Sequence, residues 1–252
     1  MAAIPLKHDD VYYPESDGEP MAETELHRVV MTDLINGLRR RYASAPDVYV
    51  NGNMFFYDVQ GNPRSSFSPD VFLVKGVSKE IRRVYKIWEE GEVPCFIVEV
   101  TSDKTRKEDT GSKKARYERL GCEEYFHFDP YGDYLDPRLQ GYRLESGRYQ
   151  PLAASPDGSL FSRTTGLILR VERSRLRLVD AATGEELPWD EELGARLDQE
   201  REEAARAKER AAREAEARHA AEARAAREAE ARRAAEDEIA RLRRELEERN
   251  RG

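Results

Sequence analysis

Two carboxylates interrupt the most apolar segments of this chain. Asp70 lies in SPDVFLV, and Glu99 lies in FIVEV. An ionised carboxylate in apolar surroundings is costly to desolvate unless a cation or a hydrogen-bond donor offsets the penalty. Two converging carboxylates are a typical protein contribution to a Mg²⁺ site, because that ion prefers oxygen ligands and retains waters or phosphate oxygens. The pair therefore indicates a metal site, with one alternative left open: each carboxylate could lie at a strand end and pair with a nearby arginine.

The segments around these carboxylates are typical of a mixed α/β core. Residues 95–100, CFIVEV, are apolar on both faces, as expected of a central strand covered on both sides. The following segment, EDTGSKKARYERLG, predicts a helix that is capped by Asp109 or Ser112 and ended by Gly121. EYFHFDP then predicts another strand. This order of strand, helix and strand predicts an α/β core with mixed strand pairing.

One further helix and several short strands complete the expected domain. Residues 21–42 carry an amphipathic stripe of side chains four apart, formed by Leu26, Val30, Leu34 and Leu38. DVYV, MFFYDV and SPDVFLV predict strands, because they are rich in Val, Phe and Tyr. SKEIRRVYKIWEEGEVP fits a helix and a strand equally well. After Pro137, turns at Ser-Gly, Asp-Gly and Thr-Gly predict short antiparallel strands.

The composition divides the chain near residue 190. The whole chain has 252 residues, a formal charge of -8 and a pI near 5.3. From Asp190 onward it consists mainly of Ala, Glu and Arg, with 16 basic and 19 acidic residues, whereas the preceding part holds nearly all the Phe, Tyr, Pro and Gly. Neither part is basic, so any contact with nucleic acid must be local. We expect a domain at residues 12–187 and a helical tail at 190–252.

The cysteines and the apolar segments bear on the compartment. Cys95 and Cys122 have neither the spacing of a zinc site nor the density of a disulfide scaffold, which favours a reducing compartment. MAAIPLKHDD contains no apolar core of a signal peptide, and no segment is long and apolar enough to cross a bilayer. We therefore expect a cytoplasmic protein without a membrane partner.

The tail contains an internal repeat. AAREAEAR occurs at residues 211–218 and again at 225–232, an interval of two heptads. The a and d positions carry leucine or isoleucine near both ends and mainly Ala, Arg and Glu between, so the seam is weak in its middle. Oppositely charged residues four apart support an isolated helix: Glu209 and Arg213, Glu214 and Arg218, and Glu228 and Arg232. These patterns predict one long exposed helix and leave a homodimeric coiled coil open.

The segment around both carboxylates also resembles a known family. SPDVFLV, and residues 94–130 from PCFIVEV to EYFHFDP, are similar to the Uma-type putative restriction endonuclease domain family, a branch of the PD-(D/E)XK nuclease superfamily. The similarity continues in YYPESDGEPMAETELHR before them and in LQGYRL, GRYQPL and TGLILRV after them, and covers residues 12–187. It implies a restriction-endonuclease-like mixed β-sheet core flanked by helices.

The superfamily pattern implies an aspartate on one strand and Glu-x-Lys on the next, which hold Mg²⁺ against a scissile phosphate. Asp70 and Glu99 match its acidic positions. The chain departs from the pattern at Thr101, which occupies the place of the lysine and projects to the same face as Glu99. A hydroxyl cannot supply the missing positive charge.

A lysine from the following helix would restore that charge. The Uma-type spacing of Asp, Lys and Tyr at intervals of four is met by Asp109, Lys113 and Tyr117, which share one helix face. The resemblance therefore implies Lys113 as the catalytic lysine, with Lys114 as the alternative. Without this context, a helix lysine is simply solvated. Glu25 and His27 stay outside the predicted site, because a first-turn acid and a lone histidine are more often structural.

The resemblance implies a Mg²⁺-dependent endonuclease that hydrolyses DNA phosphodiester bonds, with Mn²⁺ as a substitute ion. Asp70, Glu99 and the carbonyl of Val100 would hold the ion, and Lys113 would orient the water or neutralise the charge that builds on the phosphate. A set of basic side chains could contact the DNA backbone: Lys104, Arg106, Lys107, Lys113, Lys114, Arg116 and Arg119.

Two other functional classes remain open. The first is a nuclease fold without activity, which acts as a DNA-binding or assembly module through its helical tail. The second, a glycosidase with two carboxylates, is disfavoured because that chemistry needs no lysine and no aromatic sugar platform is evident.

Overall fold

The computed structural model of the chain describes residues 11–16, 24–102 and 109–249. The chain divides into two compact units, Met1–Asp190 and Glu191–Gly252. The first unit has the predicted α/β class with a mixed sheet, and the long C-terminal helix is present. We describe the two units separately.

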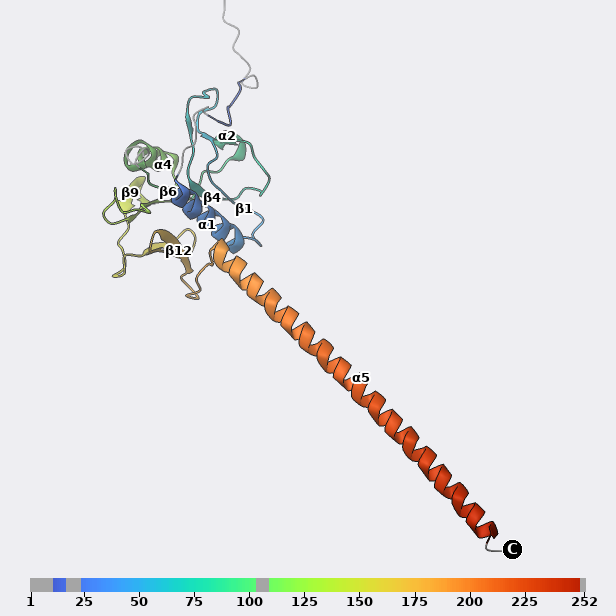
Figure 1. The fold of residues 1–252 in the computed structure, drawn as a ribbon. Coiled ribbons are helices and arrows are strands. Elements are labelled where there is room, and N and C mark those ends of the chain that lie inside the picture. The colour runs from blue at the N-terminus through green and yellow to red at the C-terminus, as the bar shows by residue number, and fades with distance from the viewer. Residues whose placement is uncertain (1–10, 17–23, 103–108, 250–252) are drawn as a thin grey trace, which may run out of the picture. The chain divides into compact units, whose positions relative to one another are not determined.

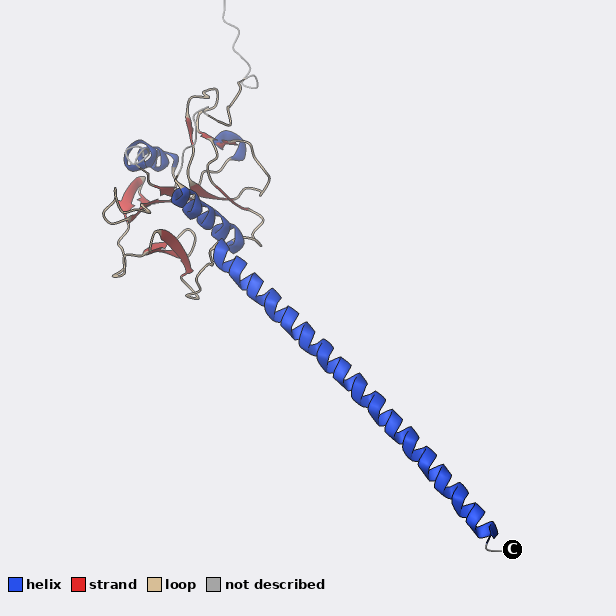
Figure 2. Ribbon diagram, in the orientation of Figure 1, coloured by secondary structure: helices blue, strands red, loops and turns tan. Residues whose placement is uncertain are grey.

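A six-stranded sheet forms the centre of the first unit (Figure 2). In spatial order its strands are β1 (Val48–Asn51), β4 (Val71–Lys75), β6 (Phe96–Val100), β7 (Glu124–Phe128), β8 (Leu139–Glu145) and β9 (Arg148–Pro151). The pairing of β6 with β7 is parallel, and the other pairings in this sheet are antiparallel. Every residue of β6 and β7 is buried, as expected of strands covered on both faces.

Helix α1 (Glu25–Arg41) covers one face of this sheet (Figure 1). Its Val30, Leu34 and Leu38 share an apolar cluster with Val98 and Val100 of β6. These three helix residues belong to the stripe predicted for residues 21–42. Thr24 caps the helix, and residues 21–23 lie outside the described part of the chain.

The other face of the sheet contacts helix α4 (Lys114–Leu120) and aromatic side chains of a smaller sheet. Ile97 of β6 belongs to this second cluster together with Tyr117 of α4. Because side chains alternate along a strand, Glu99 points to the same face as Ile97. The carboxylate of β6 is thereby directed toward α4.

Two three-stranded sheets and a short helix complete the first unit. One sheet has the order β3 (Ser66–Phe67), β2 (Phe56–Tyr57) and β5 (Tyr85–Lys86); the other consists of β10 (Leu160–Ser162), β11 (Leu167–Glu172) and β12 (Arg175–Asp180). Helix α2 (Ile87–Glu90) follows β5 directly. The segment that fitted a helix and a strand equally therefore contains a short piece of each. Ile81 is fully exposed and belongs to neither.

A buried carboxylate joins the central sheet to the sheet of β10. Glu124 of β7 is 1 % exposed and accepts a hydrogen bond from Arg143 Nε at 2.9 Å. It also accepts from Ser162 Oγ, from the Arg163 amide at 2.9 Å and from the Thr164 amide at 3.1 Å. A charge buried this deeply is tolerated because several donors surround it.

Replacing Glu124 with alanine is expected to lower the free energy of unfolding by roughly 3–5 kcal/mol, because it leaves the partners of a buried carboxylate unsatisfied. Urea unfolding followed by circular dichroism measures this loss. Glu123→Ala is the matched control, since the Glu123 side chain is exposed and its one hydrogen bond from a described residue is a long one, from Thr164 Oγ1 at 3.4 Å. Equal stabilities of the two variants would contradict this role of Glu124.

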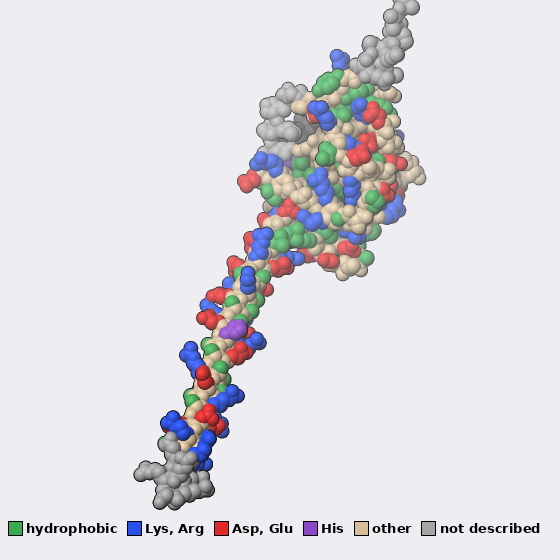
Figure 3. Space-filling view, turned by 90° about the vertical axis from the view of Figure 1, so that its right-hand side faces the viewer, with side chains coloured by type: hydrophobic (Ala, Val, Ile, Leu, Met, Phe, Trp, Pro, Cys, Tyr) green, Lys and Arg blue, Asp and Glu red, His purple; other side chains and the backbone are tan. Residues whose placement is uncertain are grey.

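The described part of the second unit is a single helix, α5 (Asp190–Arg249, 60 residues), which begins at the last residue of the first unit. Side chains of both charges are interspersed along it (Figure 3). Glu209 pairs with Arg213 as predicted, at 2.5 Å. The other two predicted pairs differ. Arg218 pairs with Glu222 and Arg232 with Glu236, each four residues later in the chain, instead of with Glu214 and Glu228, four residues earlier. Within the described residues, no helix combines the length and the apolar character that a membrane span needs.

Candidate active site

Asp70 directly precedes β4, and its side chain reaches the end of β6. Its Oδ2 atom accepts a hydrogen bond from the backbone amide of Val100 at 2.8 Å. The same oxygen lies 3.3 Å from Nε2 of His27, a buried residue in the first turn of α1. Residues of two different elements, α1 and β6, therefore contact one carboxylate oxygen of Asp70.

Glu99 is completely buried in β6, and α4 and the turn before it supply its partners. Tyr117 Oη donates to Glu99 Oε1 at 2.6 Å, and Lys113 Nζ lies 2.9 Å from Glu99 Oε2. The structure thus brings together Glu99 and Lys113, and Val100 links them to Asp70. Among the described residues, the partners of the two carboxylates include a histidine, a lysine, a tyrosine and a backbone amide.

The electrostatics of the site keep Asp70 ionised and Tyr117 neutral. Burial acts to raise the pKa of Asp70, but the hydrogen bond from His27 and the charge of Lys113 outweigh it, and the pKa lies below its ordinary value. Burial, together with the negative charge of Glu99, raises the pKa of Tyr117 well above its ordinary value. Tyr117 therefore remains a hydrogen-bond donor to the carboxylate.

Adjacent lysines have different environments. Lys113 is the last residue of a π-helical turn, η2 (Asp109–Lys113), and its side chain is 17 % exposed. Lys114 begins α4, and its Nζ lies 3.4 Å from the centre of the Tyr142 ring. Lys113 therefore faces the carboxylates, whereas Lys114 makes a cation–π contact elsewhere.

The start of this helix differs from the prediction. The residue at the N-cap of α4 is Lys113, without a side-chain cap, and not Asp109 or Ser112. The physical reason is the π-helical turn, which leads directly into the α-helix and so leaves no separate capping residue. Gly121 ends the helix in the left-handed region with a φ of +90°, as predicted. The side chain of Asp109 lies outside the described residues.

Gly52 approaches the backbone of Asp70 too closely for any side chain. A Cβ atom on Gly52 would lie 2.0 Å from the carbonyl oxygen of Asp70 and 2.7 Å from Cδ1 of Ile35. The neighbouring Asn53 amide donates to the carbonyl of Pro69 at 2.9 Å. The turn after β1 therefore forms one wall of the Asp70 position.

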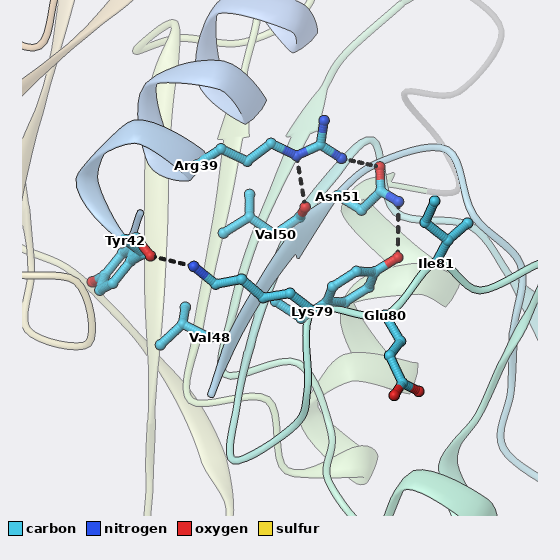
Figure 4. A pocket seen from close by; sticks show the side chains of 9 residues that line it. Arg39, Tyr42, Val48, Val50, Asn51, Lys79, Glu80 and Ile81 are labelled. Carbon is cyan, nitrogen blue, oxygen red and sulfur yellow. Dashed lines mark hydrogen bonds between the residues drawn. The ribbon is translucent and has the colours of Figure 1, made fainter. Parts of the chain in front are cut away.

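Polar contacts hold this turn at the edge of a cavity of about 550 Å³ (Figure 4). Arg39 Nη2 donates to Asn51 Oδ1 at 3.0 Å, and Arg39 Nε donates to the carbonyl of Val50 at 3.0 Å. Asn51 Nδ2 donates to Tyr49 Oη at 2.9 Å, and Asn51 Oδ1 also accepts from the Gly52 amide at 3.0 Å. The polar groups of this cavity thus fix the residue before Gly52.

Two contributors to the site, His27 and Gly52, were not predicted. His27 stands at intervals of four and seven from Met31 and Leu34, which places it on the buried stripe of its helix, and this spacing was the available signal. The pair Asn51-Gly52 by itself indicates only a turn between strands. Glu25, in contrast, is exposed in the first turn of α1.

The oxygen atoms present fit a hydrated Mg²⁺ better than a metal held entirely by protein. Among the described residues, no three His, Cys, Asp or Glu side chains form a group that could hold a metal ion. Asp70 Oδ1 accepts no hydrogen bond from a described residue, and the buried Thr101 hydroxyl also has no partner among them. Mg²⁺ usually retains several waters beside one or two carboxylates, and such waters can donate to a hydroxyl like that of Thr101.

The basic side chains of the predicted DNA contact are only partly described. Lys104, Arg106 and Lys107 lie outside the described residues. Arg116 donates to the carbonyl of Ser66, and Arg119 lies 3.7 Å from Asp58. Both arginines therefore have partners within the protein.

A family model matches more than half of this chain. The family model named Uma2, with the description "Putative restriction endonuclease", matches residues 2–172. None of the curated proteins compared with the chain matches it. Among solved structures, one similar chain is the crystal structure of "a putative nuclease belonging to DUF820" from Anabaena variabilis, with 13% identity and a TM-score of 0.45. That similarity covers 64% of this chain and 91% of the other.

Proposed function

The chain belongs to the Uma2 family of putative restriction endonucleases, and from this premise we propose that it hydrolyses DNA phosphodiester bonds with Mg²⁺, for which Mn²⁺ substitutes. The observation that carries the proposal is the convergence of Glu99, Lys113 and the Asp70–Val100 contact at one end of β6. We assign the activity to residues 12–187 and regard 190–252 as a separate helical tail.

Asp70 and Glu99, with the carbonyl of Val100, would hold the cation. When bound, the ion supplies a water of lowered pKa and withdraws charge from the phosphate oxygens. Each carboxylate oxygen has two lone pairs, so Glu99 can accept from Tyr117 and Lys113 and still bind an ion. The rigid central strand fixes the direction of its carboxylate.

Lys113 would neutralise the negative charge that develops on the phosphate or orient the attacking water. Its ammonium group already lies in the site through its contact with Glu99, so little reorganisation is needed when substrate binds. The buried Tyr117 holds the other oxygen of Glu99 and so keeps the carboxylate from turning.

A second candidate function is an inactive nuclease fold that serves as a DNA-binding or assembly module. The observation that favours it is α5, which lies outside the residues matched by the family and exposes side chains along its described length. Homodimeric pairing through this helix belongs to the same proposal. A wild-type chain that shows no metal-dependent cleavage would favour this second function.

The proposal is tested by incubating the full chain with supercoiled plasmid and with single-stranded DNA in Mg²⁺, Mn²⁺ or EDTA. We expect cleavage with either ion and none in EDTA, because the carboxylates alone cannot activate water. Asp70→Ala, purified in the same way, is the control for contaminating nucleases and should be inactive. Cleavage that persists in EDTA or in Asp70→Ala would refute the proposed mechanism.

A further inference from the structure

His27 is a buried polar side chain whose backbone is fixed by a helix cap. The His27 amide donates to Thr24 Oγ1 at 3.2 Å, and the Arg28 amide donates to the carbonyl of Thr24 at 3.2 Å. The residue is 6 % exposed and lies on the same helix side as Met31 and Leu34. Its imidazole therefore approaches the candidate site from a rigid element.

The imidazole and a backbone amide share one oxygen of Asp70. His27 Nε2 lies 3.3 Å from Asp70 Oδ2, and the Val100 amide lies 2.8 Å from that oxygen. Contacts from two different elements, α1 and the end of β6, thus restrict rotation of the carboxylate. Its Oδ1 atom, which accepts no hydrogen bond from the described residues, is left to face an incoming ligand.

We propose that His27 is a positioning residue that orients Asp70 so that Oδ1 is available to a divalent cation. This inference rests on the proposed function. A hydrogen-bonded partner behind a metal-binding group fixes its direction, and loss of such a partner typically weakens metal affinity about 10–100-fold. The role requires a proton on Nε2, since Asp70 can only accept when it is ionised.

Mn²⁺ binding to the full chain, measured from the free-ion signal in electron paramagnetic resonance, tests this role without any cleavage assay. His27→Phe fills a similar volume without a donor and should weaken Mn²⁺ binding about 10–100-fold. His27→Gln carries an amide donor and should restore most of the affinity. His219→Phe is the matched control, because His219 is exposed on α5 and should bind Mn²⁺ like the wild type.

The outcomes separate this inference from the proposed function. A wild-type chain that takes up no Mn²⁺ would refute the metal site itself. Wild-type binding that His27→Phe leaves unchanged would overturn the positioning role alone. If His27→Phe does not fold, long-range nitrogen–proton NMR of the wild-type imidazole decides the matter: a proton on Nε2 whose signal shifts in Asp70→Asn supports the role, and a bare Nε2 overturns it.

Discussion

Replacement of Lys113 with methionine is expected to lower the rate of DNA cleavage by about 10²–10³-fold, the usual loss when one preorganised charge-stabilising donor is removed from an active site. Methionine keeps much of the side-chain length but carries no charge. The measurement is the single-turnover rate with Mg²⁺ in excess, so that a change in ion affinity does not limit the rate.

The same variant should also be less stable. Lys113 is a cationic partner of a carboxylate with no exposed surface, and breaking a buried pair by removal of one partner costs roughly 3–5 kcal/mol. Added Mg²⁺ should recover part of that loss, because a bound ion would compensate the charge of Glu99. Thermal unfolding with and without Mg²⁺ measures both effects.

Lys114→Met is the matched control for these measurements. Lys114 is the next residue but contacts the Tyr142 ring rather than the carboxylates. We expect its cleavage rate to stay within about threefold of the wild type, a change below 1 kcal/mol in the barrier. If Lys114→Met lost more activity than Lys113→Met, the assignment of the catalytic lysine would be wrong.

Gly52→Ala should lower the rate of DNA cleavage nearly as much as Lys113→Met, although residue 52 carries no side chain and no charge. The added Cβ atom would lie 2.0 Å from the Asp70 carbonyl oxygen, and a backbone atom cannot move away without displacing the residue itself. A misplacement of about 1 Å at a catalytic group can cost on the order of 10²-fold in rate. Overpacking of this kind also destabilises a protein by roughly 1–3 kcal/mol.

Cleavage rate, Mn²⁺ affinity and urea unfolding should all change in Gly52→Ala, since the clash displaces Asp70. Gly194→Ala provides the control, because a Cβ at Gly194 of α5 meets nothing within 4 Å. In a helix that substitution should stabilise by about 0.4–1 kcal/mol and leave cleavage unchanged. Normal activity in Gly52→Ala would show that the turn can shift without moving Asp70.

The strands of the site could be predicted because their sequences conflict with a surface position. CFIVEV is apolar on both faces, which predicts a central strand covered on both sides. Glu99 is the one charged residue within it, and so it could be identified as a candidate site residue. What the sequence could not supply is the order of strands. The placement of β4 beside β6 depends on pairing across the sheet, and local patterns carry no information about which strand is adjacent.

The supporting residues escaped prediction for a related reason. His27 becomes significant only beside Asp70, and the two belong to elements that are distant in the chain. The constraint on Gly52 likewise comes from a carbonyl of another segment, whereas Asn-Gly indicates a turn wherever it occurs. The π-helical turn before Lys114 has no strong residue signature, so a continuous α-helix was expected in its place.

The hydrogen bond from Arg39 to the carbonyl of Val50 also affects the edge of the central sheet. Strand β1 forms one end of the six-stranded sheet, and a terminal strand with open acceptors can recruit a strand from another molecule. Here a guanidinium already occupies one such acceptor and brings a positive charge to the border of the sheet. Concentrated samples should therefore resist aggregation by strand addition at this border, with a charged side chain acting as the gatekeeper.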